Sequence, residues 1–167
     1  MSYEINILAV NQKEPIKLNF ASKILLQNEK EDCMVNRYAE IWPFFSNMPG
    51  VLYSLVTEMY EGYYSSFAIC DSDFETEIKE YFLPTCLLEE YKENLTPFIV
   101  REPFVGEFIQ ILRYIIENAP QKRILFQTRY QGGDGEIIVG VIKMKHFLKM
   151  LRRKEILFNV CYIVESD

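Results

Sequence analysis

Hydrophobic and polar positions alternate most clearly in the C-terminal part of the chain, where they predict two strands. Residues 121–130 place Phe126 on one face and Gln127 on the other, as in a strand with one wet side. The glycine-rich residues 132–135 can adopt positive φ, and the β-branched residues 136–142 follow them. We therefore expect a β-hairpin here.

A change to helical spacing begins at Met144. Apolar residues fall on one side up to Leu151, and lysines and arginines occupy the other, so this stretch predicts a short amphipathic helix. Residues 156–164 are apolar on both faces apart from Asn159, which is typical of a strand inside a sheet that is covered on both sides. Cys161 is therefore expected to be buried.

The N-terminal pattern also predicts extended structure. Two sets of side chains alternate along residues 3–10, and residues 16–20 repeat this alternation after a break at residues 11–15. This predicts either two strands or one strand followed by an extended arm. The charged stretch 28–32 is expected to be a loop.

The middle of the chain shows helical spacing in several places. Residues 103–119 form the longest such stretch, and its apolar stripe is wide enough to lie across the C-terminal strands. Glu107, Gln110 and Arg113 are expected to face water. Residues 61–70 fit either a strand or a loop. Four shorter helices are predicted over residues 34–42, 51–60, 71–82 and 87–95.

Together these elements predict an α+β fold. A small, mostly antiparallel sheet would consist of the N-terminal strand or strands, the C-terminal hairpin and the final strand, packed with about five or six helices. The 167 residues suit a single domain, and the apolar fraction of 49% favours a folded chain. No apolar run approaches the roughly 20 residues that span a bilayer, and the N-terminus lacks the pattern of a signal peptide. We therefore expect a cytoplasmic protein.

The charge is distributed unevenly. The formal net charge is −6, yet residues 143–154 hold six basic residues and no acidic ones. Residues 58–93 hold ten acidic residues against two lysines. Such an acidic field repels nucleic acid and anionic membranes and attracts a basic protein. The basic helix is expected to be a solvated face that balances the acidic remainder, with nucleic acid or acidic lipid binding as the alternative.

Few residues suggest catalysis or metal binding. The four cysteines form no Cys-x-x-Cys pair, so free structural thiols are expected. The alternating acids of residues 71–77 have the spacing of a calcium loop, but Thr76 stands where its sharp turn needs glycine, which favours a solvated helix start. A strand follows residues 132–135, which favours a hairpin turn over a phosphate site. His146 is the only histidine and the one candidate catalytic base. No metal or cofactor is predicted.

The strongest candidate surface combines tyrosines with carboxylates. Tyrosines supply large contact areas at small entropy cost, and carboxylates beside them can pair with Arg and Lys of a partner. The alternative is that tyrosines of this region, such as Tyr53, line the core. The predicted partner-binding residues are Glu58, Tyr60, Glu61, Tyr63, Tyr64, Asp71, Asp73, Glu75, Glu77 and Glu80.

Phe147-Leu148-x-x-Leu151, followed by the apolar stretch 156–164, resembles the ends of small cytoplasmic immunity proteins encoded beside bacterial polymorphic or contact-dependent growth inhibition toxins. The resemblance is confined to the C-terminal third of the chain and includes no shared functional residues. It implies a non-enzymatic protein that binds one toxin domain, often a nuclease, and blocks its active site or substrate groove.

The resulting hypothesis is a toxin-neutralising immunity protein whose partner is a cognate, basic toxin domain. The acidic balance agrees with it, because a nuclease must present a basic surface to its substrate and an acidic inhibitor can occupy that surface. Neither nucleic acid nor a membrane is expected as a partner. The alternatives are a small enzyme that uses His146 with nearby carboxylates, and a regulatory or structural subunit.

Overall fold

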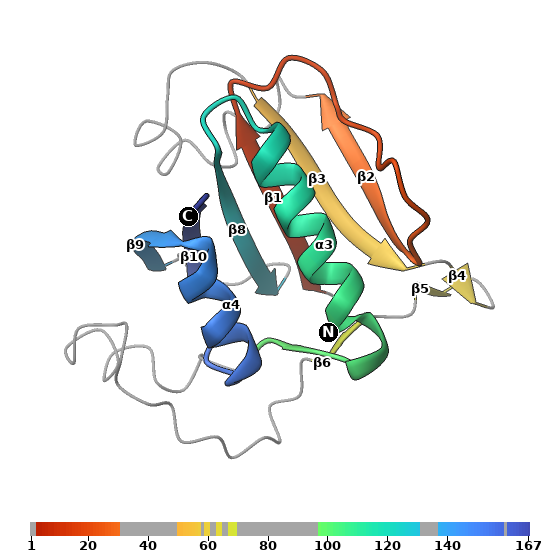
Figure 1. Ribbon diagram of the computed structural model, residues 1–167. Helices are drawn as coiled ribbons and strands as arrows, with labels where there is room; N and C mark the ends of the chain where they lie inside the picture. The colour runs from red at the N-terminus through yellow and green to blue at the C-terminus, as the bar shows by residue number, and fades with distance from the viewer. Residues whose placement is uncertain are drawn as a thin grey trace.

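The computed structural model describes residues 3–30, 50–57, 59–60, 63–64, 67–69, 97–130, 137–158 and 160–167. Within these residues the fold is a mixed six-stranded sheet in the order β2-β3-β1-β8-β10-β9, with two helices packed on one face (Figure 1). Neighbouring strands are antiparallel except β9 and β10, which are parallel. The strands of this sheet are β1 (Tyr3–Val10), β2 (Ile24–Lys30), β3 (Gly50–Thr57), β8 (Arg123–Tyr130), β9 (Ile137–Lys143) and β10 (Val160–Glu165).

The two helices lie over different parts of the sheet. Helix α3 (Glu102–Asn118) crosses its middle, and α4 (Met144–Arg152) connects the parallel strands β9 and β10 and packs beside them. Two short strand pairs lie outside the main sheet. They are β4 (Met59–Tyr60) with β5 (Tyr63–Tyr64), and β6 (Ala68–Ile69) with β7 (Ile99–Val100).

The core between sheet and helices is built around buried aromatic rings. The Phe126 ring of β8 contacts Phe108 of α3 at 5.8 Å between centroids and Phe147 of α4 at 5.2 Å. Phe98 contacts the rings of both Phe108 and Phe126. Such edge contacts contribute about 0.5–1.5 kcal/mol per pair beyond the burial of their area. One strand residue thus ties both helices to the sheet.

The opposite face of the sheet is also buried at its centre. Leu8, Leu52 and Leu125 form a second apolar cluster there together with Cys161 and Ile163. Strands with apolar residues on both faces do not alternate cleanly between apolar and polar positions. This explains why the prediction of one wet face for β8 is wrong, since Leu125 and Gln127 are both buried.

The predicted fold class is wrong in its proportions. In the described part of the chain the mixed six-stranded sheet dominates and only two helices pack on it, in place of the expected small sheet with about five or six helices. The predicted helix over residues 51–60 is strand β3 up to Thr57. The predicted helices over residues 34–42, 71–82 and 87–95 lie outside the described residues.

The predicted hairpin between β8 and β9 is also wrong, because β10 lies between them and pairs with both. Tyr162 of β10 is paired with Val139 and the next residue, Ile163, with Val141. Gly140 is therefore an extra residue in β9, which makes a β-bulge. Helix α4 follows β9 and leads back to β10, which makes β9 and β10 parallel neighbours.

Several local predictions are confirmed. Both predicted amphipathic helices exist as α3 and α4, with their apolar stripes buried. Cys161 is buried in an interior strand, as expected. Residues 16–20 belong to an extended arm, which was one of the two alternatives, and β2 follows at residues 24–30, partly where a loop was expected.

Candidate functional site

The extended arm of residues 11–23 folds back along the helix side of the sheet and is held by long-range contacts. Asn11 begins it with a φ of 63°, a conformation that asparagine tolerates better than most residues. The Ile16 N–H donates to the hydroxyl of buried Tyr53 at 3.0 Å. The Tyr114 hydroxyl of α3 donates to the Lys17 carbonyl at 3.2 Å. The arm is thereby fixed to both the sheet and α3.

Glu107 of α3 anchors the end of the arm. One oxygen of its carboxylate accepts a hydrogen bond from the Ser22 hydroxyl at 3.0 Å. The same oxygen accepts the N–H groups of Lys23 at 3.0 Å and Ile24 at 3.1 Å. Glu107 therefore does not simply face water as predicted, because it fixes where β2 begins relative to α3.

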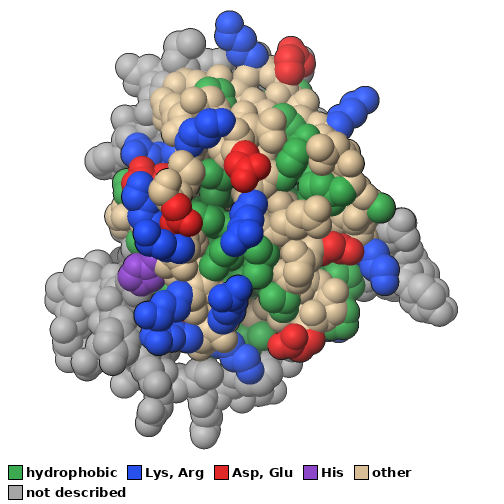
Figure 2. Space-filling model, viewed as in Figure 1, with side chains coloured by type: hydrophobic (Ala, Val, Ile, Leu, Met, Phe, Trp, Pro, Cys, Tyr) green, Lys and Arg blue, Asp and Glu red, His purple; other side chains and the backbone are tan. Residues whose placement is uncertain are grey.

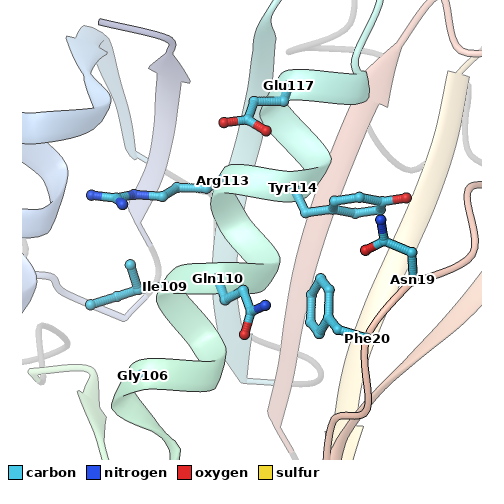
Figure 3. A pocket seen from close by; sticks show the side chains of 8 residues that line it. All are labelled: Asn19, Phe20, Gly106, Ile109, Gln110, Arg113, Tyr114 and Glu117. Carbon is cyan, nitrogen blue, oxygen red and sulfur yellow. The ribbon is translucent and has the colours of Figure 1, made fainter.

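Between the arm and α3 lies a shallow groove of about 370 Å³ (Figure 3). Phe20 of the arm meets Tyr114 edge to face at 5.6 Å and forms one wall. Gly106 leaves open space on the helix, because nothing lies within 4 Å of where a Cβ would stand. The lining residues are Asn19, Phe20, Gly106, Ile109, Gln110, Arg113, Tyr114 and Glu117.

The groove has two chemically different sides. Figure 3 shows Tyr114 extending toward Asn19 and Phe20 of the arm, while Arg113 extends away from the arm on the other side of α3. The residues that line the groove offer two aromatic rings, two side-chain amides and two opposite charges, but none of them is a nucleophile beside a base. The groove is therefore suited to binding a polar or aromatic group rather than to covalent chemistry.

A basic surface covers the exposed side of α4. The apolar residues of α4 are buried, while Lys145, Lys149 and Arg152 are exposed, as predicted. Figure 2 shows several Lys and Arg side chains close to the histidine. His146 is also exposed on α4 and does not line the groove. Positive charges in the last turn of a helix complement its dipole. Part of this basic character therefore stabilises the helix itself.

The C-terminal residues hold the start of α4 and the end of β10. Lys143 precedes the helix and supplies no side-chain cap; instead an Asp167 carboxylate oxygen accepts the Lys145 N–H at 2.9 Å. Glu165 bridges Arg123 at 2.9 Å and Lys143 at 3.0 Å. Hydrogen bonds from Arg123 and then Lys143 lower the pKa of the Glu165 carboxyl.

The predicted partner-binding residues are placed only in part. Strands β4 and β5 pair Tyr60 with Tyr63 and Met59 with Tyr64, beyond the end of β3 (Figure 1). Tyr53 is fully buried in the core, as the alternative interpretation expected. The other predicted residues, Glu58, Glu61, Asp71, Asp73, Glu75, Glu77 and Glu80, lie outside the described residues.

The groove was not found from the sequence. The sequence pattern predicts a strand or an extended arm at Phe20, and it places Gln110 and Arg113 on the solvent side of the helix. Those two helix residues are exposed as expected, but the periodicity cannot show that a distant arm lies beside them. The break at residues 11–15 was the one local sign that the chain leaves the sheet there.

Within the described residues no three His, Cys, Asp or Glu side chains gather in a way that could hold a metal ion. No helix in the described part of the chain combines the length and apolarity that crossing a bilayer requires. No family model, curated protein or solved structure matches this chain.

Proposed function

We propose that the protein is a cytoplasmic, toxin-neutralising immunity protein that binds a cognate toxin domain with a basic surface, such as that of a nuclease. The observation that carries this proposal is the β4–β5 pair, which places Tyr60 opposite Tyr63. This pair lies within the most acidic stretch of the chain, residues 58–93. Tyrosines next to carboxylates are suited to contact a partner rich in Arg and Lys.

The position of the pair in the fold supports the same proposal. Only residue 58 separates β4 from the end of β3, whose residues Tyr53 and Leu55 are buried in the core. A binding element joined so closely to a rigid sheet loses little conformational freedom when its partner binds. The acidic residues would add long-range attraction, which raises the association rate more than it lowers the dissociation rate.

The test measures binding of the purified toxin domain encoded by the neighbouring gene. Charge reversal at Asp71, Asp73, Glu75 and Glu77 should lower the association rate at low salt by about tenfold or more, and added salt should reduce the difference. Reversal of Glu102 and Glu117, two exposed acids of α3, serves as the control and should change the rate little.

The tyrosines are tested separately. Tyr60→Ala and Tyr63→Ala should each raise the dissociation rate, because aromatic anchors near the centre of an interface contribute about 2 kcal/mol or more. Unchanged binding in both the charge-reversed and the tyrosine variants would remove this surface from the proposal. Loss of a measurable catalytic activity in a folded His146→Ala variant would instead favour the alternative of a small enzyme.

A further inference from the structure

The main sheet has two edges that differ in character. Strands β2 and β9 are its outer strands (Figure 1). The β2 strand includes Glu29 and Lys30, and the N–H groups at its start are bound by Glu107. The β9 strand has no charged residue before Lys143 and no proline. Charge and proline are two common protections of a free edge, and β9 lacks both before Lys143.

The edge at β9 is accessible to solvent. Val141 is 47% exposed and Gly140 is exposed as well. The only other large apolar side chain with comparable exposure among the described residues is Leu25 of β2, at 38%. Among the described strands β9 pairs with β10 alone, so its outer backbone groups face away from the sheet. An apolar edge strand of this kind is suited to pair with another strand.

The bulge at Gly140 makes this edge complementary to itself. Residues 138 and 141 are paired with Cys161 and Ile163, which belong to the cluster on the face away from the helices. Residues 137 and 142 are paired with Val160 and Val164, which belong to the core under the helices.

Consider two copies related by a two-fold axis that passes between residues 139 and 140, perpendicular to the sheet. Antiparallel pairing then sets residue 138 opposite residue 141 of the second copy, and 137 opposite 142. The bulge at Gly140 shifts the alternation between the two faces by one residue in the second half of β9. Each of these two pairs therefore joins positions that lie on the same face of the sheet. Without the bulge this register would set positions of opposite faces against each other. The six residues 137–142 carry no charge, so no like charges meet.

We propose that the protein forms a homodimer in which the β9 strands of two copies pair antiparallel in this register, joining their sheets into one. The interface is isologous, and it closes at two copies because the pairing occupies the β9 edge of each copy. Backbone hydrogen bonds supply the pairing, and Val141 loses its exposed surface against residue 138 of the other copy.

The experiment is sedimentation of the full-length chain from micromolar to near-millimolar concentration, with Val141→Lys as the test variant and Leu25→Lys as the matched control. The wild type should reach a dimer. Val141→Lys should weaken association by about tenfold or more, since it places two lysines in the interface, whereas Leu25→Lys should leave it unchanged. Both positions are partly exposed at sheet edges, so both variants should fold, and circular dichroism checks this.

Hydrogen exchange gives a second measurement on the unmodified protein. Amides of residues 137–142 should exchange more slowly at high concentration, and amides of β2 should not change. A chain that stays monomeric, an association that Val141→Lys leaves intact, or one that Leu25→Lys weakens equally would each overturn the proposal. Growth beyond the dimer would also overturn it, because the isologous pairing uses up the β9 edge.

Discussion

Tyr162 carries a hydroxyl into the core, and replacing it with Phe tests how the core accommodates that group. Its side chain is 1% exposed, and its oxygen accepts the backbone N–H of Leu157 at 2.9 Å. Tyr162→Phe keeps the ring that packs on Phe147 but leaves the N–H without this acceptor. A buried donor left unpaired costs about 1–3 kcal/mol, partly offset because the hydroxyl no longer has to be desolvated. We expect a loss of about 1–2 kcal/mol, which lowers the melting temperature by roughly 2–8 °C.

The buried phenol of Tyr162 also makes the free energy of unfolding depend on pH in the alkaline range. Burial raises the pKa of Tyr162 well above its ordinary value of 10.0, against the opposing effect of the Leu157 hydrogen bond. The folded state therefore keeps the phenol proton while the unfolded chain loses it above pH 10. Stability is fully present below that pH and falls as the pH rises, by about 1.4 kcal/mol per pH unit for each such phenol. Tyr162→Phe should remove this contribution and flatten the alkaline decline.

Urea unfolding followed by circular dichroism, from pH 7 to pH 11, measures both effects. Tyr53→Phe is the comparison variant. The Tyr53 hydroxyl also accepts a backbone N–H, that of the half-buried Ile16, and burial also raises the pKa of Tyr53. Tyr53→Phe should cost less than Tyr162→Phe at pH 7. If Tyr162→Phe unfolds with the same free energy as the wild type at pH 7, the hydrogen bond to Leu157 does not stabilise the fold. If the stability of the variant falls as steeply at alkaline pH as that of the wild type, the effect of the buried phenol is wrong.

Three further predictions concern the ends of α4 and β10. Lys154 has a φ of 60° at the end of α4, so Lys154→Gly should stabilise the protein by about 1 kcal/mol in urea unfolding, and an equal gain from Lys154→Ala would contradict the reasoning. Asp167→Ala should cost about 0.5–2 kcal/mol and speed amide exchange at Lys145, while Asp167→Asn should keep most of the cap. The lowered pKa of Glu165 means that its contribution is present above the ordinary pKa of 4.5 and is lost as the pH falls below it. When the free energy of unfolding is measured at decreasing pH, that of Glu165→Gln should fall less steeply than that of the wild type.

Local periodicity predicted the elements that bury one face. Helices α3 and α4 each present one apolar stripe to the sheet, and their spacing marked them correctly. The prediction of a helix in place of β3 failed because Leu52 and Tyr53 are both buried, on opposite faces of the sheet. Apolar residues on both sides of a strand can also fit a helical spacing, so the pattern does not separate the two.

Relations between distant segments could not be predicted from local patterns. Glycines at residues 132–135 suggested a hairpin, yet β10 pairs with both strands that the hairpin would join. The groove depends on contacts such as Phe20 with Tyr114, which join the arm to a helix far along the chain. Composition identified the acidic stretch and the basic helix, but it does not give the spatial relation between charges that are distant in sequence.

The ladder between β1 and β8 joins β1 to a strand that leaves the ribosome long after it, since Tyr3 is paired with Tyr130. Until residues 123–130 have emerged, a nascent chain whose β1, β2 and β3 have already paired would offer the bare side of β1 to any neighbouring polypeptide. Contacts this distant in sequence also slow folding. Messages truncated before residue 123 should therefore yield products that need chaperones or precipitate, even though half of the sheet is encoded in them.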